Sequence, residues 1–164
     1  MADAQDRSYW FDPPDPADRQ QWAAPVGHGR FGDIELDYLD LDEEDDRVFL
    51  IEAEHPNMAK AVEQGQHEIT ENGQTVNPQL HLTINQIVQN RLWDDQPPET
   101  WTTAQRLAQR GYERHVVFHM IMSVIGEEIF AAMTGKPAPT VEELSERLEA
   151  LPEGWPPPDQ VRAH

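Results

Sequence analysis

Residues Tyr112–Met133 read YERHVVFHMIMSVIGEEIFAAM, and this stretch decides the fold. Its apolar residues fall on nearly every side of a helix, and such a helix is normally buried in the middle of its domain. Gly135 and Pro137 follow closely, a combination that ends helices. We therefore expect one long central helix around which the rest of the chain packs.

Five further helices are predicted on either side of this stretch. Pro56 and Pro78 suit first helical positions, and Thr140 with Glu143 forms a capping box. Apolar residues at i, i+3, i+4 and i+7 mark the inner faces of the helices. The expected helices span residues 43–53, 56–64, 78–93, 100–110 and 140–151. The fold class that follows is all-α, a small helical bundle of residues 43–151.

Both ends of the chain differ from this predicted domain in composition. Residues 1–42 are acidic and rich in proline, so we expect an arm that is largely irregular. Within it, residues 34–41 alternate apolar and acidic side chains, as a short strand or an extended docking segment does. Residues 152–164 form a second proline-rich segment, predicted to be a loose tail. Asn72-Gly73 marks a turn between two helices.

The chain has a net charge of -19, and residues 1–46 hold 14 of its 31 acidic residues with only three arginines. Three interpretations are open. The acidity can serve solubility in a salt-adapted or GC-rich organism, or it can let the arm bind a basic protein. It can also mimic nucleic acid. Direct binding of nucleic acid is not expected, because no basic stripe is present to neutralise phosphates.

Several other classes of protein are disfavoured by composition. No 18-residue apolar run is free of charge, so no membrane span is expected. The first residues lack the basic start and apolar core of a secretory signal. Without cysteine there is neither a disulfide framework nor a thiolate metal site. The expected location is the cytoplasm.

Two histidines lie one turn apart on the predicted central helix. His115 and His119 are four residues apart, so their rings lie on one helix face and can bridge a metal ion. His81, on the inner face of the helix predicted over 78–93, is the expected third ligand. The predicted cofactor is one divalent transition metal ion: zinc, nickel or iron.

A polar stripe continues along the same helix. Steps of four from His119 reach Ser123 and then Glu127, and Asn85 lies one turn after His81 on the facing helix. We assign Asn85 and Ser123 to outer-shell hydrogen bonds and Glu127 to acid/base catalysis beside a metal-bound water. Glu127 lies about 12 Å along the helix from His119, too far to share the metal.

Two functions from different classes are therefore open. In the first, His81, His115 and His119 hold a metal ion that activates water for hydrolysis or transfer. In the second, the protein is a non-enzymatic interaction protein, in which the histidines only hydrogen-bond within the core and the acidic arm binds a basic partner. His55 and His67 look like loop residues in both.

Several short motifs follow one another along the chain: Glu54–Pro56, Asn72–Leu82, Asp95–Pro98, Gly111, His115–Glu127 and Gly135–Pro137. In this order and spacing, the chain from about residue 50 to 150 resembles a bacterial group of small proteins known as domain of unknown function 1841. Its members usually carry a histidine where Asn85 stands and a glutamate where Ser123 stands, so the resemblance implies a reduced set of polar side chains here.

Overall fold

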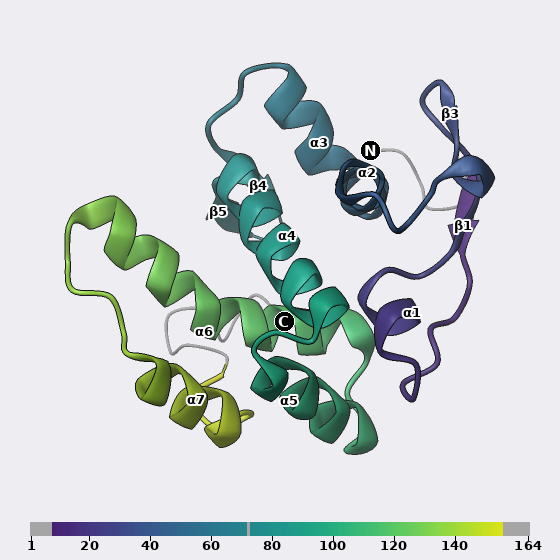
Figure 1. Ribbon diagram of the computed structural model, residues 1–164. Helices are drawn as coiled ribbons and strands as arrows, with labels where there is room; N and C mark the ends of the chain where they lie inside the picture. The colour runs from purple at the N-terminus through teal and green to yellow at the C-terminus, as the bar shows by residue number, and fades with distance from the viewer. Residues whose placement is uncertain (1–7, 72, 156–164) are drawn as a thin grey trace.

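The predicted central helix is present as α6, which begins at Arg114 and ends at Thr134 in a computed structural model that describes residues 8–71 and 73–155. The C-cap is Gly135, whose φ of 70° lies in the left-handed region that glycine adopts without strain. Figure 1 shows the other helices arranged around α6. Over the described ranges they are α1 (Arg19–Ala23), α2 (Glu44–Glu54), α3 (Pro56–Glu63), α4 (Pro78–Asp94), α5 (Pro98–Gln109) and α7 (Val141–Ala150).

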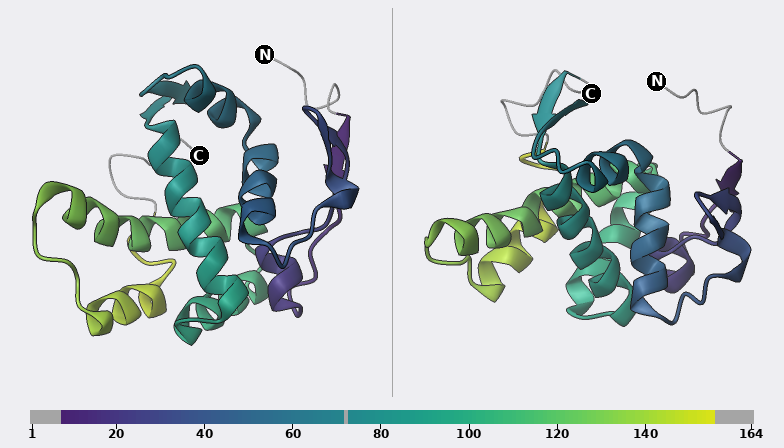
Figure 2. Two further views of the ribbon diagram at one scale, coloured as in Figure 1. Left: turned by 45° about the horizontal axis from the view of Figure 1, so that its top comes forward. Right: turned by 90° about the horizontal axis from the view of Figure 1, so that it is seen from above.

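The helix predictions are confirmed to within two residues at each end, with α1 as an addition that was not predicted. Helix α4 crosses α6 steeply instead of running alongside it, as two further views make clear (Figure 2). The aligned bundle expected from the sequence is therefore not established. Helix α6 is also long and apolar enough, by length and composition, to cross a membrane, with 44% of that window buried inside the molecule.

The main core forms where α1, α4, α5 and α7 meet the first two thirds of α6. Trp22 of α1 stacks on Phe118 of α6, with ring centres 5.4 Å apart. Leu151 and Trp155, which follow α7, also pack on this core. The buried members include Val88, Leu92, Ala104, Leu107, Val117, Met120, Ile121, Val124, Ile125 and Leu148.

The fold is mostly helical but not all-α, because two small sheets accompany the helices. Strands β1 (Tyr9–Phe11), β2 (Gly27–Phe31) and β3 (Ile34–Glu35) form an antiparallel sheet in the order β1-β2-β3. A short 3-10 helix, η2 (Leu36–Tyr38), follows. Strands β4 (Ile69–Glu71) and β5 (Gln74–Val76) form a hairpin. Of the segment 34–41, predicted from its alternation as a short strand or an extended docking segment, only Ile34–Glu35 is strand, and a 3-10 helix follows it.

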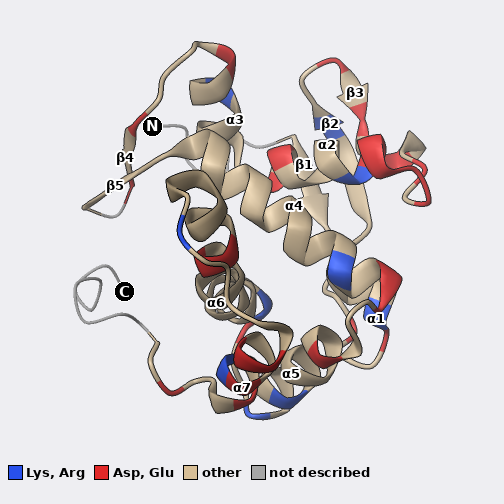
Figure 3. Cartoon of the chain, turned by 60° about the vertical axis from the view of Figure 1, so that its left-hand side comes forward, with Lys and Arg blue, Asp and Glu red and all other residues tan. Residues whose placement is uncertain are grey.

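The N-terminal arm, expected to be largely irregular, is attached to the helical domain by its aromatic side chains. The Tyr9 hydroxyl donates a hydrogen bond to the Ala53 carbonyl at 2.7 Å. Gly29 allows β1 and β2 to approach closely, since a Cβ there would lie 2.2 Å from the Ser8 carbonyl oxygen. Acidic side chains nevertheless gather around β3 and the segment leading into α2 (Figure 3).

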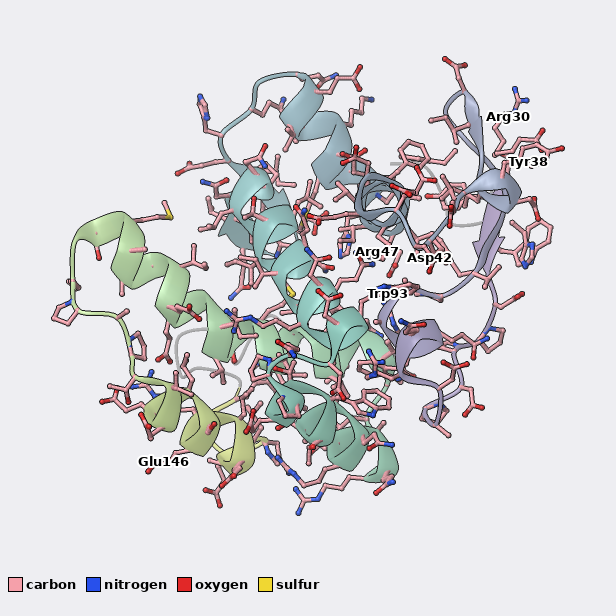
Figure 4. The ribbon with its side chains drawn as sticks, viewed as in Figure 1. Arg30, Tyr38, Asp42, Arg47, Trp93 and Glu146 are labelled. Atoms are coloured by element: carbon pink, nitrogen blue, oxygen red, sulfur yellow. The ribbon has the colours of Figure 1, made fainter. Side chains whose placement is uncertain are left out.

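Arginine side chains complete the attachment by donating to backbone carbonyls, some of them far away in sequence. Arg114 donates to the carbonyls of Trp22 (2.6 Å) and Ala23 (2.9 Å), and to the Glu54 carboxylate (2.8 Å). Arg47 donates to the Leu41 carbonyl and lies over the Trp93 ring (Figure 4). These bonds satisfy carbonyls at element ends that would otherwise be buried without a partner.

Replacing Arg114 with Met is expected to lower the free energy of unfolding by about 3 kcal/mol. The variant keeps an apolar stem on Phe118 but leaves the Glu54 carboxylate, 19% exposed, without its counter-charge. Urea denaturation measures the change. Arg30→Met is the matched control, since Arg30 is 58% exposed where it pairs with Glu35 and should cost less than about 1 kcal/mol. Equal losses in the two variants would contradict the attachment role.

A charged cluster also fastens the N-terminal sheet. The His28 ring lies between Asp12 (Nε2 to Oδ2, 3.0 Å) and Asp37 (Nδ1 to Oδ1, 2.7 Å). The hydrogen bonds from His28 to Asp12 and then Asp37 raise the pKa of His28 above 6.5. The same His28 bond, with one from the Gly29 amide, lowers the pKa of Asp37 below 3.8.

His28→Gln is therefore expected to destabilise the protein most at pH 5 to 6 and progressively less toward pH 9. A histidine whose folded pKa is raised contributes its stability below its unfolded pKa and loses it as the pH rises through the folded value. Differential scanning calorimetry of both proteins across this range gives the difference in Tm. A difference that stays constant with pH would contradict the charged bridge.

Candidate metal centre

The polar stripe on α6 lies on the less buried side of the helix and divides into three parts. His119 and Ser123 are half-buried, whereas His115 and Glu127 are exposed. The His115 side chain is 69% exposed and its Nδ1 lies 3.3 Å from Glu113 Oε2. His115 was expected beside His119, but each step of four residues turns about 40° around the helix. His115 is in the first helical turn of α6, where this rotation leaves its side chain facing solvent.

The His119 ring instead belongs to a group of three neighbouring imidazoles. We call this group, His55, His81 and His119, the histidine cluster. The ring centres of His81 and His119 are 5.4 Å apart, with the rings edge to face. Those of His55 and His81 are 5.5 Å apart in the same arrangement. His81 of α4 is thus the middle member, between His119 of α6 and His55 of the α2–α3 junction.

His55 is fixed in place by the backbone geometry of that junction. It is the C-cap of α2 and the N-cap of α3, and Pro56 begins the second helix. Its Nδ1 lies 2.9 Å from the Ile51 carbonyl oxygen. Because a carbonyl only accepts, Nδ1 carries the proton, and the neutral ring keeps a lone pair on Nε2. That tautomer is ready for metal ligation through Nε2.

The environment of the His81 ring disfavours its charged form. Burial first, and then the charges of His55 and His119, lower the pKa of His81 from 6.5 to about 3. Its Nε2 is buried with no hydrogen-bond partner among the described residues. Glu54, next to His55, has one such atom as well, Oε1, while its Oε2 accepts from Arg114. Buried polar atoms of this kind normally have a partner, whether protein, water or an ion.

The residues expected around the metal make other contacts. Asn85 is buried in the α4–α6 contact, where its amide donates to the Met122 sulfur at 3.8 Å. The Ser123 hydroxyl donates to the Met120 carbonyl at 2.6 Å. Glu127 forms an ion pair with Arg147 of α7. At two helical turns from His119, Glu127 is not near the histidine cluster.

Donor atoms in the cluster do not yet converge. Within residues 8–71 and 73–155, no group of three or more His, Asp or Glu side chains is arranged to hold a metal ion. The ring spacing is nevertheless that of ligands: with zinc about 2.1 Å from each nitrogen, two imidazoles on one tetrahedral ion have ring centres about 5 Å apart. This spacing holds for two pairs, His55 with His81 and His81 with His119.

We expected His55 to be a loop residue, so it was not among the predicted metal ligands. The signal that points to it is the motif Glu54–Pro56, one of the pieces that carries the family resemblance. A histidine that both ends one helix and begins the next has a fixed backbone, unlike a residue in an open loop. Periodicity could not find it, since it belongs to no helix face.

Comparison with known proteins gives a family and nothing finer. No curated protein and no solved structure matches the chain. The family model described as Domain of unknown function (DUF1841) matches residues 37–150, more than half of the 164. That range begins in η2 and ends with α7, so it contains every member of the histidine cluster and leaves out β1, α1, β2 and β3. The chain belongs to the DUF1841 family.

Proposed function

We propose that this protein binds one divalent transition metal ion at the histidine cluster, with His55, His81 and His119 as ligands. The observation that carries the proposal is the position of His81 between imidazoles of two other segments, with ring centres 5.5 and 5.4 Å away, while its own buried Nε2 has no hydrogen-bond partner among the described residues. Neutral imidazole suits zinc, nickel and iron. His55 takes the place that the sequence assigned to His115.

The alternative explanation, a purely structural role for the histidines, accounts less well for the cluster. A structural histidine in a core normally hydrogen-bonds to backbone or to a carboxylate. His55 does so through Nδ1, but the buried Nε2 of His81 does not. A metal ion would satisfy that nitrogen. The low pKa of His81 also means that protons do not compete for it near neutral pH.

Three protein ligands leave a tetrahedral ion with an open position for water or substrate. A metal ion in such a site lowers the pKa of bound water and so supports hydrolysis or transfer. Glu54 is the acidic residue next to a proposed ligand, with one buried carboxylate oxygen unpartnered. Glu127 pairs with Arg147 and lies two helical turns from His119, so we do not assign it as the acid/base group of this site.

The test is metal binding by the untagged full chain, freed of metal with a chelator. Cobalt(II) is titrated in by calorimetry, and zinc retained after gel filtration is counted by elemental analysis. We expect about one ion per chain. His55→Ala and His119→Ala should each weaken binding at least about ten-fold, the lower end of the effect of losing even an outer-shell group. Circular dichroism checks that each variant is folded.

His115→Ala and His67→Ala are the matched controls, because both histidines are exposed and neither belongs to the cluster. Neither control should change the affinity. Loss of metal in His115→Ala with retention in His55→Ala would reject the cluster in favour of the ligand set His81, His115 and His119. Absence of metal from the wild type, after exposure to zinc, nickel, manganese and iron(II), would reject metal binding altogether.

A further inference from the structure

Near the C-terminal end of α6, large apolar side chains are exposed to solvent. Met133 is 64% exposed and Phe130 is 56% exposed, and Val141 at the start of α7 is 71% exposed. In Figure 1 this end of α6 extends beyond α4 and α5. A helix that is apolar on all faces normally has all faces covered. Large apolar side chains exposed next to one another mark an interaction surface.

A groove lies directly beside these side chains, and we call it the α6–α7 groove. It has a volume of about 530 Å³. Ala131 and Gly126 line it on the α6 side, and Pro137 and Pro139 line it with backbone of restricted freedom. Exposed Phe130 lies at its edge, with the Lys136 amine 5.7 Å from the ring centre. The surface thus has apolar projections and, adjoining them, a hollow of a size to receive them.

The charges around the groove are balanced. It is lined by two carboxylates, Glu127 and Glu143, and by two cations, Lys136 and Arg147. Elsewhere the chain is strongly acidic, with a net charge of -19 and only two lysines in all. Two copies of such a chain repel each other over most of their surface. At this surface the repulsion is absent, because each copy presents both positively and negatively charged side chains to the other.

We propose that a second copy of this chain covers this surface, so that Phe130 and Met133 of each copy enter the α6–α7 groove of the other. A twofold dimer places the same surface against itself, which requires a patch that complements itself in shape and charge. The groove and its neighbouring apolar side chains meet both conditions. The proposal does not depend on metal binding, because the histidine cluster lies outside this surface.

The first test is analytical ultracentrifugation of the full chain at concentrations up to about 200 µM, since interfaces of standard size reach micromolar affinity or better. A dimer is expected. Its affinity should increase with salt, because salt screens the repulsion between two acidic chains. Phe130→Ser/Met133→Ser should weaken dimerisation at least ten-fold. Ile34→Ser/Tyr38→Ser is the matched control, removing two exposed apolar side chains from the opposite part of the fold.

A second test does not depend on the stability of those variants. The chain has no cysteine, so single cysteines can be introduced on the exposed surface. A mixture of Met133→Cys and Ala138→Cys chains should cross-link between copies under mild oxidation, whereas Tyr38→Cys chains should not. A monomeric wild type at the highest concentration would overturn the proposal. An unchanged dimer in the double variant would also overturn it. So would a wild-type chain that binds neutral lipid vesicles instead of forming a dimer, with this binding lost in the double variant.

Discussion

The side chains of α6 are apolar on almost every face between Val116 and Ile125, so the rest of the chain has to exclude water from a whole cylinder. Helices α4, α5 and α7 cover three sides, and α1 covers part of the remainder with Trp22. Burying an aromatic or aliphatic side chain stabilises a fold by about 2 kcal/mol, so this cover is the largest favourable term available to a domain of this size.

Covering α6 creates a second requirement, because helix ends then lie inside the molecule. The final carbonyls of a helix have no partner within it. Arg19 and Arg106 donate to such carbonyls at the ends of α4 and α7, as Arg114 does at the end of α1. A planar guanidinium with five donors can serve two or three carbonyls at once, which an ammonium does less well. Arginine suits these three positions for that reason.

The helices could be predicted from sequence because their signals are local. Proline at the first position of α3 and α4, and Gly135 after α6, act within one turn. The N-terminal sheet could not be predicted in this way. Its strands have two to five residues, and they are held by contacts such as Tyr9 with Ala53, 44 residues apart. The site was also only partly predictable from local signals. His81 and His119 lie on the facing sides of two predicted helices, whereas His55 lies at the junction between two helices.

The polar stripe of α6 illustrates how one sequence pattern divides into separate environments. At its start His115 faces solvent, in its middle His119 meets His81, and at its end Glu127 pairs with Arg147 beside the α6–α7 groove. A helix face turns gradually, and the neighbouring helices cover only part of its length. Periodicity therefore identifies which residues share a stripe, while the crossing point of α4 decides which of them meets a second histidine. Of the residues in the stripe, only His119 is a candidate ligand, because it meets His81 at this crossing. The C-terminal end of α6 extends beyond the crossing, and large apolar side chains there are exposed.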